Sequence, residues 1–336
     1  MRRRKQRNYV KRDQRLTALP PKKSLLDRLK LEGDLPARVL AWAVPACPFF
    51  LQPVFVTAYT LIFFFIAEKP RRAVQANLAT LEPDESPIGI WWNSFLVFLN
   101  FAWTCVDTER ASEDAGALRW EIEGAERFDQ AAKLDSGLLV LTAHMGSYDV
   151  AASVFADRFG EKKLHAVRAP EPTDELQKFR RQSLEQTAGG GLSIAYNTTD
   201  GFLGIDLVRA LANGDAVAIQ GDRVMYDVAP SVCKLRDSVG DPIKLQVPKG
   251  PFVLAMASKV PILPVFVVRI GSSQFRVICG EMFICERTGR DKEFDLQRAI
   301  NRWGLVLEKL LREHSSQWYV FEDAFVEDTP GPGGDK

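Results

Sequence analysis

The feature that most constrains the fold is a stretch of 29 consecutive residues without a charged side chain, from Val39 to Ala67. A helix of about 20 apolar residues is long enough to cross a lipid bilayer. Pro45, Pro48 and Pro53 interrupt the stretch, and only Val54 to Ala67 is predicted as an unbroken helix, which is too short to span by itself. We therefore expect a kinked span or an interfacial hairpin, with a buried core helix as the alternative.

Basic side chains flank this stretch on both sides, with Arg38 before it and Lys69, Arg71 and Arg72 after it. Because positively charged flanks stay on the cytoplasmic side of a membrane, we expect both ends there. A second apolar stretch, Ile88 to Val106, places most of its aromatic side chains on one helical face. We expect it either to lie in the lipid interface or to pack the membrane segment onto the rest of the chain.

Charge, cysteine and histidine content argue against several classes of protein. The 336 residues carry a formal net charge of +1, which does not favour nucleic acid as the main partner. The five cysteines are scattered and form no Cys-x-x-Cys pair, so we expect reduced thiols in a cytoplasmic domain. The three histidines lack the spacing of a helical metal-binding pair, and no metal site is predicted.

Four regions are predicted along the chain: a basic flexible arm (1–37), a hydrophobic membrane-associated helical region (38–106), an α/β domain (107–328) and a loose tail (329–336). In the third region apolar runs alternate with helical patterns, which predicts an α/β fold: a central mixed, mostly parallel sheet flanked by helices, preceded by an N-terminal hydrophobic membrane-binding helical arm. The expected strands are Gly137 to Thr142, Leu164 to Arg168, Ser193 to Tyr196, Ala216 to Gln220, Ile262 to Ile270 and Phe275 to Cys279. The expected helices are Asp149 to Phe159, Asp174 to Thr187, Gly201 to Ala212, Gly250 to Lys259 and Phe294 to Glu313.

The first of these strands leads to residues that can carry chemistry. His144 follows it, and Gly146 can adopt the dihedral angles of a tight turn. Ser147 is a suitable N-cap, and Asp149 suits the positive end of the helix dipole. We expect Asp149 to fold back and accept a hydrogen bond from His144, fixing the tautomer of the imidazole as the acid of a catalytic triad does. The alternative is a structural histidine beside a helix cap.

No serine in a Gly-x-Ser-x-Gly turn accompanies this histidine anywhere in the chain. A hydroxyl group that His144 activates is therefore expected to belong to a substrate. The tripeptide Gly189-Gly-Gly191 lacks the pattern of a phosphate-binding loop and is interpreted as a turn.

Four blocks carry a resemblance to a known family. They are His144-Met-Gly-Ser-Tyr-Asp149, Ala166-Val-Arg168-Ala-Pro170, Gly214 to Arg223, and Pro248 to Ala255 with Val260 to Val267. In order and spacing they resemble the glycerolipid and lysophospholipid acyltransferase superfamily, which carries a His-x-x-x-x-Asp/Glu (HxxxxD) motif after a strand, and within it the bacterial lipid A late (lauroyl/myristoyl) acyltransferase branch. The similarity covers Arg71 to Phe325. The third block is not the Glu-Gly-Thr-Arg form of glycerol-phosphate acyltransferases, so the acceptor stays open.

The resemblance implies an O-acyltransferase that needs no bound cofactor and forms no acyl-enzyme. His144 would act as general base on a hydroxyl of a lipid or glycolipid, which attacks the thioester of acyl carrier protein or coenzyme A, while Asp149 orients the base. Arg168 and Arg223 are candidates for binding substrate anions, and Gly146 and Ser147 lie where backbone amides can hold an oxyanion or a phosphate.

Two further points complete the sequence-based interpretation. Asp222 is a further candidate in the substrate site, either positioning Arg223 or acting as an ordinary turn acid. The expected location is the cytoplasmic (inner) membrane, with the catalytic domain on its cytoplasmic face. Two rival functions use the same residues: a lipid or thioester hydrolase in which the His-Asp pair activates water, and a non-catalytic lipid-binding protein.

Overall fold

The computed structural model describes Ala43 and residues 47–113, 116, 118–171, 174–188, 190–197, 202–224, 228–235, 243–289 and 291–326. The predicted basic arm at 1–37 and the predicted tail at 329–336 lie outside the described residues.

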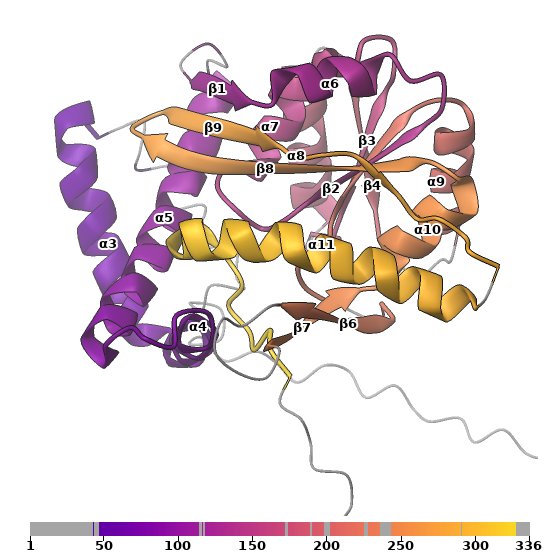
Figure 1. Ribbon diagram of the computed structural model, residues 1–336. Coiled ribbons are helices and arrows are strands. Elements are labelled where there is room, and N and C mark those ends of the chain that lie inside the picture. Colours follow the sequence, from indigo (N-terminus) through magenta and orange to yellow (C-terminus); the bar gives the residue numbers. More distant parts are fainter. Residues whose placement is uncertain are drawn as a thin grey trace, which may run out of the picture.

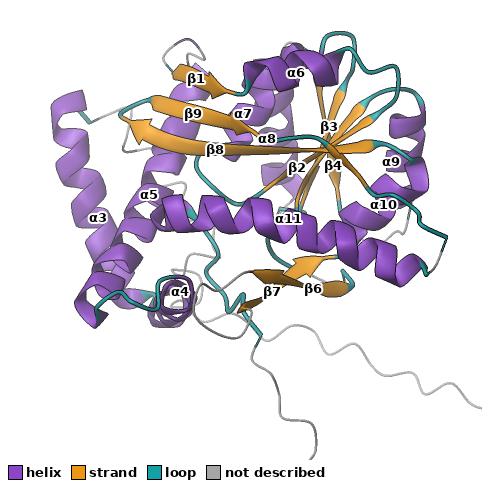
Figure 2. Ribbon diagram, viewed as in Figure 1, coloured by secondary structure: helices purple, strands orange, loops and turns teal. Residues whose placement is uncertain are grey.

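An eight-stranded sheet forms the centre of the molecule (Figure 2). Its strands are β1 (Arg119–Glu123), β2 (Leu138–Thr142), β3 (Leu164–Arg168), β4 (Leu192–Tyr196), β5 (Ala216–Gln220), β8 (Pro261–Gly271), β9 (Gln274–Cys279) and β10 (Phe283–Ile284). Their spatial order is β1-β9-β8-β2-β5-β3-β4, with β10 paired to β8. Neighbours from β8 to β4 are parallel, whereas β9 and β10 run antiparallel to β8. The sheet is therefore mixed and mostly parallel, as predicted.

Helices cover both faces of this sheet (Figure 1). One face carries α6 (Ala125–Ala132), α7 (Tyr148–Phe155) with a following 3-10 turn η3 (Ala156–Phe159), and α8 (Asp174–Thr187). The other face carries α9 (Leu203–Ala212), α10 (Gly250–Ser258) and α11 (Lys292–His314), together with a separate antiparallel pair, β6 (Pro230–Leu235) and β7 (Ile243–Pro248).

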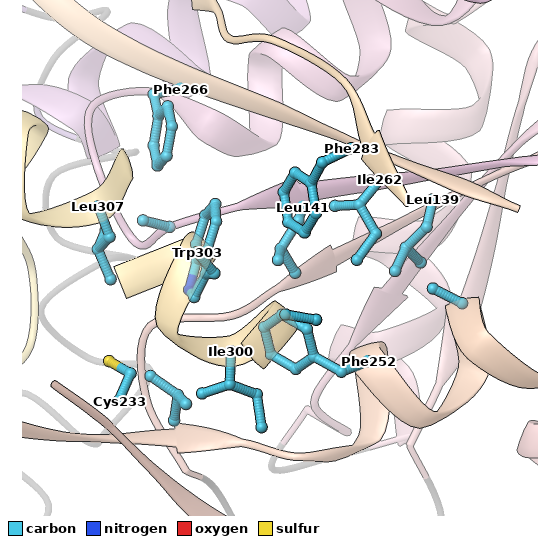
Figure 3. Close-up of a cluster of buried hydrophobic side chains, with 14 of the residues drawn as sticks. Leu139, Leu141, Cys233, Phe252, Ile262, Phe266, Phe283, Ile300, Trp303 and Leu307 are labelled. Atoms are coloured by element: carbon cyan, nitrogen blue, oxygen red, sulfur yellow. The ribbon is translucent and has the colours of Figure 1, made fainter. Parts of the chain in front are cut away.

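The alternation of side chains along β2 divides the core between these two faces. Leu138 and Val140 pack into the cluster under α6 and α7, whereas Leu139 and Leu141 point into the cluster under α10 and α11. Figure 3 shows the second cluster, in which Trp303 of α11 stacks on a phenylalanine of β8 at a ring-centroid distance of 5.4 Å. Burial on both faces explains why β2 is almost continuously apolar.

The sequence predicted six of the eight strands of this sheet and, within the described residues, five of the six helices of the α/β domain, with ends that differ by a few residues. It missed β1, β6, β7, β10 and α6. β1 has charged residues at alternating positions and β10 has only two residues, so neither gives a clear apolar pattern, and the amphipathic pattern of α6 extends over only eight residues.

Within the described residues, the N-terminal arm contains the helices α3 (Gln52–Ile66), preceded by the 3-10 turn η1 (Phe49–Leu51), α4 (Glu68–Leu81) and α5 (Pro87–Glu113). The axes of α3 and α4 meet at an angle of 94°. The break follows from Pro70, which has no N–H to donate and whose ring would clash with the carbonyl group of Ile66 in a continuous helix. Arg71 Nη1 donates to the carbonyl oxygen of Phe64 at 2.7 Å and satisfies the open end of α3. The unbroken helix predicted at Val54 to Ala67 corresponds to α3, and the bend follows it at Ala67. Pro45 lies outside the described residues.

The arm is joined to the α/β domain by specific contacts. The side chain of Asn77 in α4 donates to the carbonyl oxygen of Glu322 at 2.8 Å and accepts from the backbone N–H of Ala324 at 3.1 Å.

In α5, residues Pro87–Thr108 are long and apolar enough to cross a bilayer, and 39% of the apolar window is buried within the protein. The helix continues beyond the predicted boundary at residue 106, and it packs against the 3-10 turn η4 (Ser315–Gln317).

Candidate active site

The turn that carries His144 begins directly after β2. Its conformation depends on Gly146, which has a φ angle of +52°. A Cβ atom at this position would lie 2.4 Å from the carbonyl oxygen of Val267 in β8. Glycine is therefore required both by the dihedral angle and by the lack of space, as the sequence predicted for a tight turn. The turn places His144 at the carboxyl edge of the sheet, where sites in open α/β folds usually lie.

His144 forms a buried pair with Asp222. Its Nδ1 atom lies 2.8 Å from Oδ1 of Asp222, and its backbone N–H donates to Oδ2 at 2.9 Å. The two residues meet because β5, which precedes Asp222, pairs with β2 in parallel register, with Gln220 opposite Thr142. Asp222 is fully buried, and the side chain of His144 is 9% exposed. Because an ionised carboxylate only accepts hydrogen bonds, the neutral form of His144 carries its proton on Nδ1 and keeps the lone pair on Nε2.

The surroundings of Asp222 favour its ionised form. Burial raises the pKa of this carboxyl group, but the charge of His144 and the hydrogen bonds from His144 and Trp318 lower it by more, so the pKa lies below its ordinary value. Trp318 contributes through its indole Nε1, which donates to Oδ2 of Asp222 at 2.9 Å. Asp222 is therefore a carboxylate at neutral pH, which is the form that selects the tautomer of His144.

The acidic residue that the structure places on the imidazole differs from the one predicted. The sequence assigned this position to Asp149; the structure does not describe the side chain of Asp149, and its role stays a prediction. Asp222 was interpreted as a partner of Arg223 or as a turn acid, whereas it accepts hydrogen bonds from His144 and Trp318. The signal that the sequence analysis did not use is the pairing of β2 with β5, which brings the residues after both strands together.

A cavity of about 230 Å³ opens beside this pair. Its polar side chains include those of His144, Tyr148, Gln220 and Glu171. Its apolar part is formed by Ala152, Ala166, Leu184, Leu192, Ile194 and Ala218. No serine or cysteine side chain lines the cavity within the described part of the chain. A long apolar group bound here would present its polar end to His144.

Both predicted arginines line the same cavity. Arg168 ends β3, and its Nη2 atom lies 3.5 Å from Oε1 of Glu171. Arg223 follows Asp222, and its Nε atom lies 3.6 Å from Oε1 of Glu322. The two guanidinium groups supply positive charge beside His144, in a site that is largely shielded from water.

Ser147 occupies the predicted N-cap position of α7 but does not form the predicted cap hydrogen bond. Its side chain is fully buried, and Oγ has no hydrogen-bond partner among the described residues. The ψ angle of 57° departs from the extended conformation in which an N-cap hydroxyl usually reaches the helix amides.

Metal ligands do not gather at this site. Within the described ranges, no group of three or more His, Cys, Asp or Glu side chains is arranged to hold a metal ion. The five cysteines are free thiols and lie outside the lining of the cavity. The cavity thus brings together an oriented histidine and two arginines beside the start of α7.

Comparison with known proteins gave one family. A family model described as bacterial lipid A biosynthesis acyltransferase matches residues 37–326. No curated protein matches the chain. The matched region includes the arm helices, the whole sheet and every residue of the site described above.

Proposed function

Because the chain belongs to the bacterial lipid A biosynthesis acyltransferase family, we propose that it transfers a fatty acyl group from a thioester to a hydroxyl group of a lipid or glycolipid, with His144 as general base. Family membership makes the chain an acyltransferase of lipid. The donor, either acyl carrier protein or coenzyme A, and the roles of individual residues are parts of the proposal.

The observation that carries the proposal is the buried His144–Asp222 pair beside a cavity that has both an apolar part and charged side chains. A base with a fixed tautomer and a site for an acyl chain are what direct acyl transfer requires. The described lining contains no serine or cysteine, which favours transfer without an acyl-enzyme.

The reaction follows from the tautomer. Nε2 of His144 removes the proton of the acceptor hydroxyl as its oxygen forms a bond to the thioester carbonyl carbon. The tetrahedral intermediate then collapses, the carbon–sulfur bond breaks, and the imidazolium returns the proton to the leaving thiolate. Asp222, hydrogen-bonded to Nδ1, stabilises the imidazolium between these two steps without itself becoming protonated.

Charged groups around the cavity are suited to anionic substrates. Arg168 and Arg223 would bind phosphate groups of the donor or of the lipid acceptor, since guanidinium groups form paired hydrogen bonds to phosphate. The backbone amides at the start of α7, next to Ser147, would hold the developing oxyanion. The apolar part of the cavity would take the acyl chain, because it offers no polar partner over most of its surface.

The arm would bind the membrane that contains the acceptor. Ten of the seventeen exposed large apolar side chains in the described part of the chain lie on the arm. They are Phe50, Leu51, Val54, Leu61, Ile62, Phe65, Ile66, Ile88, Trp91 and Trp92. Exposed apolar side chains gathered on one part of the chain are unfavourable in water and favourable at a lipid interface. We place the protein at the cytoplasmic face of the inner membrane, where both acyl thioesters occur.

The proposed reaction is tested with the purified full chain, labelled acyl carrier protein or acyl-coenzyme A, and a lipid extract from a lipid A-producing bacterium. The expected result is a new acylated lipid whose formation equals the loss of thioester. Release of free fatty acid at the same rate without any acceptor would instead identify a hydrolase. Binding of acyl chains with no turnover would identify a lipid-binding protein.

Membrane binding is tested by flotation of the full chain with vesicles that contain anionic phospholipid. The double substitution Ile62→Asp and Phe65→Asp, on the exposed face of α3, is expected to lower the bound fraction at least about tenfold. Phe202→Asp is the matched control, since Phe202 is an exposed aromatic side chain outside the arm. Equal loss of binding by both variants would contradict the assignment of the arm.

A further inference from the structure

Asp222 depends on a small set of hydrogen bonds for its orientation. Within the described residues, Oδ1 faces Nδ1 of His144, and Oδ2 accepts from the backbone N–H of His144 and from Nε1 of Trp318. Two of these three donors belong to the residue that Asp222 must orient. Trp318 is the donor that fixes the carboxylate independently of His144.

Trp318 is itself held in place by its neighbours. Its side chain is buried, its backbone N–H donates to Ser315 at 3.1 Å, and its ring meets that of Phe325 edge-on at a centroid distance of 6.0 Å. It also forms an isolated antiparallel bridge with Met145, the residue after the catalytic histidine.

The residues on either side of Trp318 extend this support. Gln317 donates to and accepts from the backbone of Arg269 in β8, at 2.8 and 2.7 Å. The backbone N–H of Tyr319 donates to the carbonyl oxygen of His144 at 2.8 Å, and its hydroxyl group lies 3.1 Å from that of Thr104 in α5. The segment 317–319 therefore connects β8, the arm and both members of the buried pair.

We propose that Trp318 is a positioning residue for acyl transfer: its indole N–H holds the Asp222 carboxylate in the orientation that keeps the proton of His144 on Nδ1 and leaves Nε2 free to act as base. The inference rests on the proposed function, because a base is needed only if the site performs the reaction. It adds a residue that lies 96 positions from Asp222 in the sequence and does not line the cavity.

A purely structural role for Trp318 makes a different prediction. Another buried tryptophan, Trp303 in α11, is fully enclosed, and its Nε1 donates to the carbonyl oxygen of Gly221 at 2.8 Å. Replacing either indole by a phenyl ring removes one buried hydrogen bond from the same core. Only Trp318 touches the carboxylate, so only its loss should change the properties of the base.

The pH dependence of the reaction separates these two roles. The hydrogen bond from Trp318 lowers the pKa of Asp222, so its removal raises that pKa and makes the carboxylate a stronger acceptor for the proton on Nδ1 of His144. A stronger acceptor favours the imidazolium over the neutral base, so the acidic limb of the reaction moves to higher pH. Among the described side chains, the other charged or titratable groups that line the cavity or contact the pair are Arg168, Glu171 and Arg223, together with Tyr148 from α7. They are unchanged in the variant, so a shift of the acidic limb reports on the pair.

The experiment compares the full-length parent with Trp318→Phe, with Trp303→Phe, and with a protein in which Trp318 is replaced by 3-benzothienylalanine. That residue keeps the bicyclic shape but has sulfur in place of the N–H, so it guards against misfolding of the phenylalanine variant. The measurements are kcat and KM for acyl transfer across the acidic pH range, the melting temperature, and the low-field proton resonance of the hydrogen bond between His144 and Asp222.

For both replacements of Trp318 we expect kcat to fall about tenfold with little change in KM, since one hydrogen bond to a charged group has an effect of this order. The acidic limb of kcat/KM should move up by roughly 0.5 to 1 pH unit, and the low-field resonance should shift. For Trp303→Phe we expect the melting temperature to fall by about as much as in Trp318→Phe, whereas the acidic limb and the resonance stay unchanged.

An unchanged acidic limb and resonance in both Trp318 replacements would overturn the proposal, as would equal kinetic changes in Trp303→Phe. If the parent itself forms no acylated lipid, the proposed function fails. The resonance still tests whether Trp318 positions the pair, because it is read without substrate.

Discussion

Replacement of Asp222 by asparagine tests the orientation of the base. Asparagine has nearly the same shape as aspartate, but it offers one acceptor oxygen and one NH₂ donor in place of two acceptor oxygens. The backbone N–H of His144 and Nε1 of Trp318 both require an acceptor at the position of Oδ2. The amide oxygen will occupy that position, and the NH₂ group will then face Nδ1 of His144, which lies 2.8 Å from the other carboxylate oxygen.

The size of the effect follows from the tautomer. Because the NH₂ group of the new asparagine is a hydrogen-bond donor, Nδ1 of His144 must act as an acceptor. The proton of the neutral imidazole then lies on Nε2, which faces the substrate and can no longer remove a proton from it. Loss of the correct tautomer in a comparable histidine–carboxylate pair lowers kcat by roughly 10⁴-fold. We expect a fall of about 10³- to 10⁴-fold for Asp222→Asn, which corresponds to about 4 to 5.5 kcal/mol of transition-state stabilisation. The three groups that contact residue 222, which are the backbone N–H and Nδ1 of His144 and Nε1 of Trp318, each keep a hydrogen-bond partner. The melting temperature should therefore fall by only a few degrees.

The assay is the initial rate of acyl transfer at saturating donor and acceptor, with the melting temperature measured on the same preparations. Asp215→Asn is the matched control. Asp215 is also paired with a histidine, with 3.0 Å between its Oδ2 and Nε2 of His165, but it precedes β5 and lies outside the cavity. The Asp215→Asn variant should therefore transfer acyl groups at the rate of the parent.

Asp149→Asn completes the comparison, because the sequence predicted Asp149 for the same role. If Asp222→Asn is as active as the parent while Asp149→Asn loses activity, the orienting carboxylate is Asp149 and the reasoning from the buried pair is refuted.

Three further predictions follow from the same contacts. Gly146→Ala should lower the free energy of unfolding in urea by roughly 2–4 kcal/mol, because residue 146 has a positive φ and a Cβ would lie 2.4 Å from Val267 O; a value equal to the parent's would contradict this. The lowered pKa of Asp222 means that its ionised form stabilises the fold above the unfolded-state pKa of about 4, and that this contribution is lost as the pH falls through the folded-state pKa. The difference in unfolding free energy between the parent and Asp222→Asn should therefore be constant near neutral pH and shrink in acid, and a difference that persists at about pH 2 would refute the assignment. Leu184→Phe, which fills part of the apolar cavity from α8, should shift the preference among competing acyl donors toward shorter chains by about tenfold, and an unchanged ranking would show that the acyl chain binds elsewhere.

The fold class could be predicted because the central strands are apolar. Leu138 to Leu141 form a run of four apolar residues, and β5 and β8 contain similar runs between helices with apolar periodicity. Strands that are half exposed, such as β1, do not have this pattern, and their place in the sheet depends on pairing with distant residues.

The site was predicted in part. His144, Arg168 and Arg223 were identified from local patterns, and the structure brings all three to one cavity. The partner of His144 was not predicted, because Asp222 lies 78 residues further along the chain and reaches His144 only through the pairing of β5 with β2. Trp318 is more distant still, and nothing near it in the sequence indicates a contact with a carboxylate.

The central claim is that His144 is the base for acyl transfer to a lipid hydroxyl group, and its most direct test is the rate of transfer by His144→Ala. The full chain is incubated with labelled acyl carrier protein or acyl-coenzyme A and the lipid acceptor, and the acylated product is quantified for folded parent and variant. The account predicts a fall of at least about 10³-fold without a matching loss of fold. A variant that transfers acyl groups at the rate of the parent would show that the histidine at the end of β2 is only part of a turn.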